Sequence, residues 1–203
     1  LTQNLSDGTR SYTLLSILDR TVTPMGARLI RRWIEQPLVD REAIQRRLNA
    51  VSRFTEATLA RGDLRDALRT MADLERLVSR CATGYATPRD LAGLARSLAL
   101  VPTIGGHLES VAFGLIQESM SQLGDHRELA LMLQRAIVDE PPLTLREGSV
   151  IRDDFDPELD KLRHAGRDGK SYIAQLEAKE RGRSGIPTPK VGYNSVFGYY
   201  LEA

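Results

Sequence analysis

"TPMGARLIRRWIEQP", residues 23–37, decides the fold class of this 203-residue chain. Thr23 is a good N-cap, Pro24 suits the first helical position, and Pro37 ends the pattern. Apolar side chains recur at the three- and four-residue spacing of one helix face: Met25, Leu29, Ile30, Trp33 and Ile34. The stretch therefore predicts an amphipathic helix.

Further amphipathic helices are expected along the chain. The residues predict them after Asp40, from about Asp63 to Cys81, from Thr87 to near Pro102, as one short helix within 104–124, and from Asp125 to Val138. The helix after Asp40 should bury one stripe of side chains: Ile44, Leu48, Val51 and Phe54. Caps, apolar stripes and short connections together indicate a helical domain of antiparallel neighbours.

The last third of the chain carries signals for β-structure as well. "LTLREGSVI", residues 143–151, places apolar residues on both sides of "REGS", which predicts a small hairpin. Asp156 then caps a last long helix that runs to about Arg181. A linker, "RGRSGIPTP", leads to the aromatic hairpin "KVGYNSVFGYYLEA", residues 190–203. The expected fold class is mainly α, a multi-helix domain with a small β-hairpin and a C-terminal β element.

Composition limits the possible classes of protein. The chain is 41% hydrophobic and 27% charged, which is typical of a globular protein with a sizeable core. It contains no apolar run of roughly 20 residues and no signal-peptide pattern at its first residues, so we expect no membrane segment. A single cysteine, Cys81, excludes an internal disulfide and fits a reducing compartment, so a cytoplasmic location is expected.

No enzyme site is expected within these residues. "GRDGKS", residues 166–171, resembles the end of a phosphate-binding loop, but His164 stands where the first glycine is needed, and the preceding residues predict a helix instead of a strand. The histidines lack the spacing of metal ligands. We therefore expect no catalytic residue, no bound cofactor and no metal site.

The aromatic hairpin has two interpretations. Asn194 and Ser195 near its turn offer small hydrogen-bonding groups, while Lys190, Arg181 and Arg183 supply positive charge, a combination that suits a phosphate backbone. Between Lys161 and Ala203 eight Lys or Arg residues face only four Asp or Glu residues. Alternatively, the hairpin belongs to a β-sheet, and its aromatic side chains pack against further strands. The residues alone leave both interpretations open.

Two glycines flank the turn of this hairpin almost symmetrically, at 192 and 198. Glycine within a strand lowers stability, so it usually marks a bend, a bulge or a close approach by something external. We expect one of these at Gly192 and at Gly198.

Five stretches, in this order, resemble the MutS family of DNA mismatch-repair proteins. They are "NLSDG" (4–8), "LLSILDRTVTPMGARLIRRWIEQPLVDREAIQRRLNAVSRF" (14–54), "DLERLVSRCATGYATPRDLAGL" (73–94), "EGSVIRDDFDPELDKLR" (147–163) and "PKVGYNSVFGYYLEA" (189–203). The resemblance covers essentially the whole chain. It implies a helical core, or lever, domain over residues 1–155, and over 156–203 a long helix that leads into a truncated clamp domain.

The resemblance also implies a role and its residues. In the family this region contacts duplex DNA through the sugar-phosphate backbone and couples the clamp to the ATPase domain. Lys190, Tyr193, Asn194 and Ser195 match the family's hairpin. We expect Lys190 to contact DNA by its charge and Asn194 and Ser195 to donate hydrogen bonds, with Tyr193 and Arg183 as further candidates.

Other functions of the family are expected outside these residues. The resemblance implies that ATP and Mg²⁺ bind in a downstream ATPase domain, that mismatches are read by an upstream domain, and that the whole protein dimerises and engages a MutL-type partner. The chain is then a fragment that stops inside the clamp. Two alternatives remain: a helical connector without DNA contacts of its own, and nucleotide hydrolysis at residues 166–171.

Overall fold

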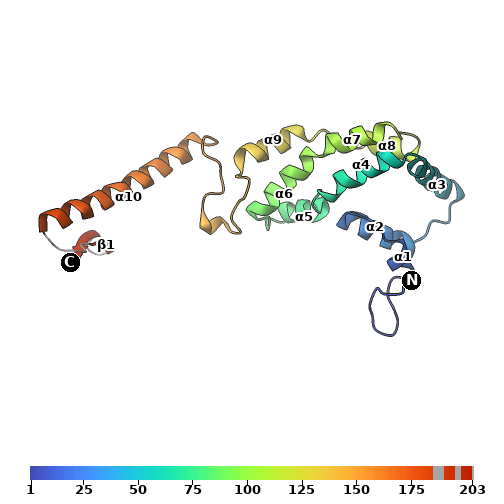
Figure 1. Ribbon diagram of the computed structural model, residues 1–203, viewed down its shortest axis with the longest axis horizontal. Coiled ribbons are helices and arrows are strands. Elements are labelled where there is room, and N and C mark those ends of the chain that lie inside the picture. Colours follow the sequence, from blue (N-terminus) through green and yellow to red (C-terminus); the bar gives the residue numbers. More distant parts are fainter. Residues whose placement is uncertain (185–189, 195–197, 203) are drawn as a thin grey trace. The chain divides into compact units, whose positions relative to one another are not determined.

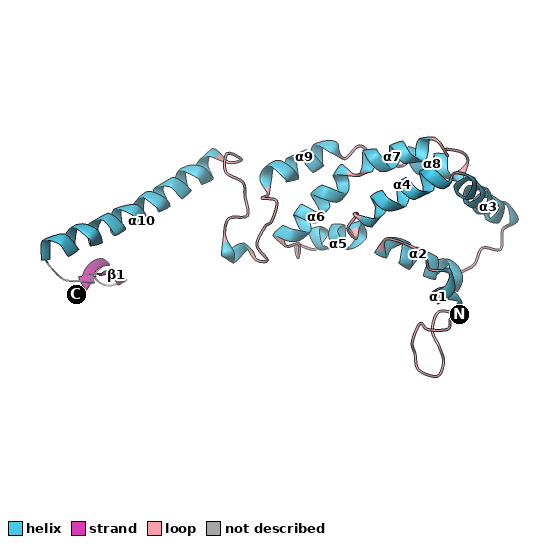
Figure 2. Ribbon diagram, in the orientation of Figure 1, coloured by secondary structure: helices cyan, strands magenta, loops and turns pink. Residues whose placement is uncertain are grey.

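The computed structural model describes residues 1–184, 190–194 and 198–202 (Figure 1). Contacts divide the chain into a first unit, Leu1–Arg152, and a second unit, Asp153–Ala203. Whether these units correspond to the lever and the clamp stays a prediction. Helices dominate the described residues (Figure 2), which confirms the mainly α fold class.

The helices and strands of the described residues are α1 (Leu14–Leu18), α2 (Pro24–Glu35), α3 (Arg41–Glu56), α4 (Thr58–Arg69), α5 (Leu74–Ala82), α6 (Pro88–Ala99), α7 (Val101–Glu109), α8 (Leu115–Ser121), α9 (Arg127–Ala136), η1, a 3₁₀ turn (Leu145–Glu147), α10 (Pro157–Ser184), β1 (Lys190–Asn194) and β2 (Gly198–Glu202).

The main hydrophobic core of the first unit lies on the two sides of α6, between α5 and α9 (Figure 1). Leu94 and Leu98 of α6 pack with Leu77 of α5 and Ala130 of α9. Ala92 packs in a second cluster with Ala136 and Ile137, the residue after α9. Small residues on α6 and α9 let these two helices approach closely, so α6 is the most deeply buried helix of the described chain.

Several helix starts confirm the caps that the sequence predicts. Thr23 accepts a hydrogen bond from the backbone of Gly26, and Asp40 accepts one from the backbone of Ala43. Thr87 forms a capping box with Asp90. Each bond joins residues three positions apart, so each helix start is fixed locally.

The predicted continuous helix from Asp63 to Cys81 is wrong. Residues 58–82 form two helices, α4 and α5, separated by a short link. Asp73 is the N-cap of α5, and the link is held by Ser97 of α6, whose hydroxyl accepts a hydrogen bond from the Ala72 N–H at 3.0 Å. A local cap and a contact from 25 residues away in the sequence therefore meet at the break.

Residues 101–138 also differ from the prediction. Two helices, α7 and α8, occupy the region where one short helix was expected, and Pro102 lies in the first turn of α7 instead of near a helix end. The cap of α9 is His126, although the Asp125 carboxylate accepts the Arg127 N–H at 3.0 Å. The helix ends at Ala136, before the expected Val138.

The small hairpin predicted at residues 143–151 is not formed. Thr144 and Glu147 form a capping box around the 3₁₀ turn η1, so this segment is bonded locally. Ile151 pairs instead with Ile137 in an isolated antiparallel bridge. The residues after α9, which the sequence analysis assigned to a helix end, take the place of the expected partner strand.

The apolar stripe of α3 is largely exposed, although burial was predicted. Leu48 is 55% and Val51 60% exposed. No described residue of α2, α3 or α4 is buried. Part of this surface is covered by arginine instead: the Arg47 guanidinium lies 3.8 Å from the centre of the Trp33 ring. The apolar faces of α2 and α3 therefore contribute little to the core of the described chain.

Candidate nucleic-acid interface

The second unit consists of α10 and a two-stranded antiparallel hairpin. Asp156 caps α10, as predicted, because its carboxylate accepts the backbone N–H groups of Glu158 and Leu159 at 2.9 and 3.0 Å. The helix extends to Ser184, slightly beyond the expected Arg181.

The register of the hairpin places most of the candidate residues. Lys190 pairs with Glu202 at one end of the ribbon, and Asn194 pairs with Gly198 at the other. Tyr193 lies opposite Tyr199. The structure thus assigns three of the candidate residues to β1, whereas Ser195 lies outside the described residues.

Arg183, the last candidate, lies exposed in the final turn of α10 together with Arg181. A cation in this position also interacts favourably with the negative end of the helix dipole. The basic end of α10 and the first residue of β1, Lys190, are therefore separated only by residues 184–189 of the chain.

The opposite end of α10 is acidic and is engaged internally. Arg163 lies 2.9 Å from a carboxylate oxygen of Asp153 and 3.4 Å from one of Asp160. The Asp154 N–H donates to the other carboxylate oxygen of Asp160 at 2.8 Å. These contacts fix the entry into α10, and phosphate binding is not favoured at a point where carboxylates are concentrated.

A carboxylate of α10 holds β1. Glu177 Oε1 accepts a hydrogen bond from the Val191 N–H at 2.9 Å. Ile173, Leu176 and Glu177 are partly buried, whereas Tyr172, like most of the neighbouring residues, is exposed. These three positions share one helix face, and Glu177 on that face contacts β1. The sequence analysis did not identify Glu177, since nothing in a helical charge pattern indicates a bond to a strand 14 residues later.

Gly192 is explained by a close approach from within the chain. A Cβ atom on Gly192 would lie 2.6 Å from Cζ and 2.8 Å from the hydroxyl oxygen of Tyr200, the residue that pairs with it on β2. The Tyr200 ring therefore crosses directly over the glycine. The sequence analysis expected any close approach to come from outside the chain, and at Gly192 this part of the prediction is wrong, because Tyr200 of β2 makes the approach.

The "GRDGKS" segment lies entirely within α10. A phosphate-binding loop must wrap its glycines around the phosphate between a strand and a helix, and a continuous helix does not allow this geometry. Among the described residues, no group of three or more His, Cys, Asp or Glu side chains is placed to hold a metal ion. In the same part of the chain, no helix has the length and apolar character needed to cross a membrane.

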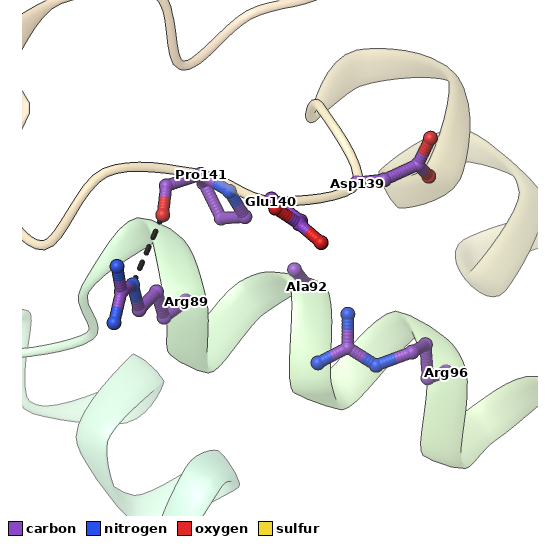
Figure 3. Close-up of a pocket in the computed structure, with 6 residues that line it drawn as sticks. All are labelled: Arg89, Ala92, Arg96, Asp139, Glu140 and Pro141. Atoms are coloured by element: carbon purple, nitrogen blue, oxygen red, sulfur yellow. Dashed lines mark hydrogen bonds between the residues drawn. The ribbon is translucent and has the colours of Figure 1, made fainter.

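A hollow of about 530 Å³ lies beside α6 in the first unit (Figure 3). Arg89 and Arg96 rise from α6 on either side of Ala92, and the Arg89 Nε donates to the carbonyl oxygen of Pro141 at 3.0 Å. Asp139 and Glu140 also line the hollow. Asp139 is ion-paired with Arg152, and the Arg89 guanidinium is bonded to a backbone carbonyl, so these groups of the hollow are engaged within the chain. The sequence analysis did not predict it, because α6 and residues 139–141 are distant in sequence.

Comparison with known proteins shows which family this chain belongs to. Residues 1–185 match the family model described as MutS domain III. The chain belongs to the MutS domain III family. A protein named DNA mismatch repair protein MutS from Symbiobacterium thermophilum is 48% identical over 201 residues, which cover 99% of this chain and 23% of that protein. Proteins of the same name from Geobacillus thermodenitrificans and Methanothrix thermoacetophila are 46% and 43% identical, over 95% and 98% of this chain and 21% and 24% of theirs.

These matches locate the hairpin within the MutS similarity. The family model ends at residue 185, before β1. The match to the Symbiobacterium thermophilum protein covers 99% of this chain, so it extends across β1 and into β2. The chain spans less than a quarter of the length of each of these three relatives. The resemblance to the MutS family that the sequence analysis stated is therefore confirmed.

Proposed function

We propose that this chain is the core and partial clamp region of a DNA mismatch-repair protein and that its hairpin binds the backbone of duplex DNA without reading the sequence. The observation that carries the proposal is the hairpin itself, held on α10 beside the basic end of that helix. It lies within the region shared with proteins named for DNA mismatch repair. Lys190, Tyr193, Asn194, Ser195 and Arg183 are the proposed contacts.

Contacts to phosphate suit this role because they give affinity without sequence preference. A protein that searches for rare errors must bind all sequences alike while it scans. In this proposal the helical first unit transmits changes between the clamp and an ATPase domain elsewhere in the longer protein, and the chain itself catalyses no reaction. Its packed α5–α6–α9 core provides a rigid element for that purpose.

For the longer protein we propose the properties that the resemblance implies. ATP and Mg²⁺ bind outside these 203 residues, the protein dimerises, and it engages a MutL-type partner. Its location is cytoplasmic. None of these properties requires a site within α1–α10 or the hairpin.

A salt series tests the DNA proposal. Fluorescence anisotropy of a labelled duplex, titrated with the chain at several salt concentrations, should give a log–log slope of about −2 to −3 for two or three phosphate contacts. Lys190→Ala should reduce the magnitude of the slope by roughly one. Lys161→Ala is the matched control, because Lys161 is exposed near the acidic start of α10, and its slope should equal that of the unmodified chain.

Two outcomes would contradict the proposal. Absence of binding at low salt would favour the alternative of a helical connector without DNA contacts. An equal change of slope for both lysine variants would show that binding depends on general charge and not on the hairpin.

A further inference from the structure

A backbone N–H of β1 is bound from outside the ribbon. In an antiparallel pair, successive N–H groups point to opposite edges of a strand. The Val191 N–H donates to Glu177 of α10, so it points away from β2. The outer edge of β1 therefore faces α10, and Glu177 supplies an acceptor that water or another strand would otherwise provide.

This bond matters because the ribbon has little support of its own. A two-stranded hairpin is marginally stable in water unless it packs against another element. Outside the ribbon, β1 is held by α10, through the hydrogen bond from the Val191 N–H to Glu177. A bond from an N–H to an ionised carboxylate is stronger than one to a neutral acceptor.

The charge of Glu177 is unfavourable for the proposed function, since a carboxylate near a DNA backbone weakens binding. Lys179, Arg181 and Arg183 follow it on α10, and a residue that served only to attract phosphate would be basic here too. The geometry gives the carboxylate a different role: it holds the strand.

We infer that Glu177 is a positioning residue for DNA binding. Its carboxylate fixes β1 on α10 and thereby gives one orientation to the strand that carries Lys190, Tyr193 and Asn194. Val191, the bonded residue, directly follows Lys190, so the lysine backbone is held next to the anchor. This inference rests on the proposed function, but the hydrogen bond and its effect on β1 do not.

Two substitutions of Glu177 separate its effect on the position of β1 from the effect of its negative charge. Glu177→Ala removes both the acceptor and the negative charge, whereas Glu177→Gln removes the charge and keeps an acceptor oxygen. Asp168→Ala is the control for loss of an acidic residue from the same helix, since Asp168 is exposed. Each variant is made in the 203-residue chain and measured in two assays.

The first assay is hydrogen exchange at the Val191 amide. Exchange should accelerate about tenfold in Glu177→Ala, as expected for the loss of one charge-assisted hydrogen bond, and much less in Glu177→Gln. Asp168→Ala should not change it. Unchanged Val191 exchange in Glu177→Ala would overturn the inference.

The second assay is the DNA titration over a salt series. Glu177→Ala should weaken binding about three- to tenfold with an unchanged salt slope, because a positioning residue makes no phosphate contact. Glu177→Gln should bind at least as tightly as the unmodified chain. If both variants bind more tightly to the same extent, Glu177 acts only by repulsion and the inference is wrong.

The two assays also separate this inference from the proposed function. If the unmodified chain fails to bind DNA, the proposed function fails. If Val191 exchange nevertheless accelerates in Glu177→Ala, Glu177 still holds β1. Only the link between this bond and DNA binding is then lost.

Discussion

Replacement of Ser97 with alanine should destabilise the first unit by about 1 kcal/mol. Ser97 is 1% exposed on α6, and its hydroxyl accepts the Ala72 N–H in the link between α4 and α5. Loss of this acceptor leaves a backbone donor without its partner, at a cost of about 1–3 kcal/mol. Because Ala72 is only partly buried, the lower half of that range applies.

Alanine returns part of this cost, since it favours a helix over serine by up to about 0.7 kcal/mol. The net loss of about 1 kcal/mol corresponds to a fall in melting temperature of about 2–4 °C for a chain of this size. Thermal denaturation followed by circular dichroism measures this fall. Hydrogen exchange at Ala72 measures the loss of the bond itself and should accelerate.

Ser79→Ala is the matched control, because Ser79 lies exposed on α5, where alanine changes only the helix propensity. It should leave the melting temperature unchanged or raise it slightly. If Ser97→Ala is as stable as Ser79→Ala and Ala72 exchanges at its original rate, the link between α4 and α5 does not depend on Ser97.

Three further predictions follow from the structure. Leu94→Ala should lower the free energy of unfolding by about 2–5 kcal/mol, measured by urea denaturation, because Leu94 is 7% exposed in the α5–α6–α9 core. Gly192→Ala should displace the exposed Tyr200 ring without unfolding the chain, and NOE contacts between that ring and residue 192 report whether the ring moves. Hydrogen bonds from Arg28 lower the pKa of Asp73, so the stability that they provide is present above the ordinary pKa of 3.8 and is lost as the pH falls below it. Arg28→Ala should therefore show a smaller loss of melting temperature between neutral and acidic pH than the unmodified chain, and equal losses would contradict this linkage.

The sequence predicts the structure well where the interactions are local. The caps at Thr23, Asp40, Thr87 and Asp156 each join groups two or three residues apart, so a short stretch contains both partners. These caps and the apolar spacing between them predict the mainly α fold class, which the structure confirms.

Secondary structure is predicted less well where contacts with residues distant in the sequence contribute to it. Ser97 is bonded to the break at 70–73, and Ile137 pairs with Ile151. Local caps at Asp73 and at Thr144 with Glu147 contribute as well, and the sequence analysis missed both. The stripe of α3 has the spacing of a buried face, yet spacing does not show whether another element covers it, and Leu48 stays exposed.

In the candidate site, too, local features are predicted from the sequence and contacts between separate elements are not. Sequence identifies the hairpin and its charged flank, because Lys190 and Arg183 lie close together in the chain. It does not identify Glu177 as the anchor or Tyr200 as the reason for Gly192, because both contacts join separate elements.

The central claim is that the hairpin contacts the DNA backbone without reading bases, and amide chemical-shift mapping tests it most directly. The ¹⁵N-labelled chain is titrated with two duplexes of equal length and unrelated sequence. We predict that both duplexes shift the same amides, those of β1, β2 and the last turn of α10, and leave the amides of α5, α6 and α9 unchanged. Shifts concentrated in the first unit, or hairpin shifts caused by one duplex and not by the other, would contradict the claim.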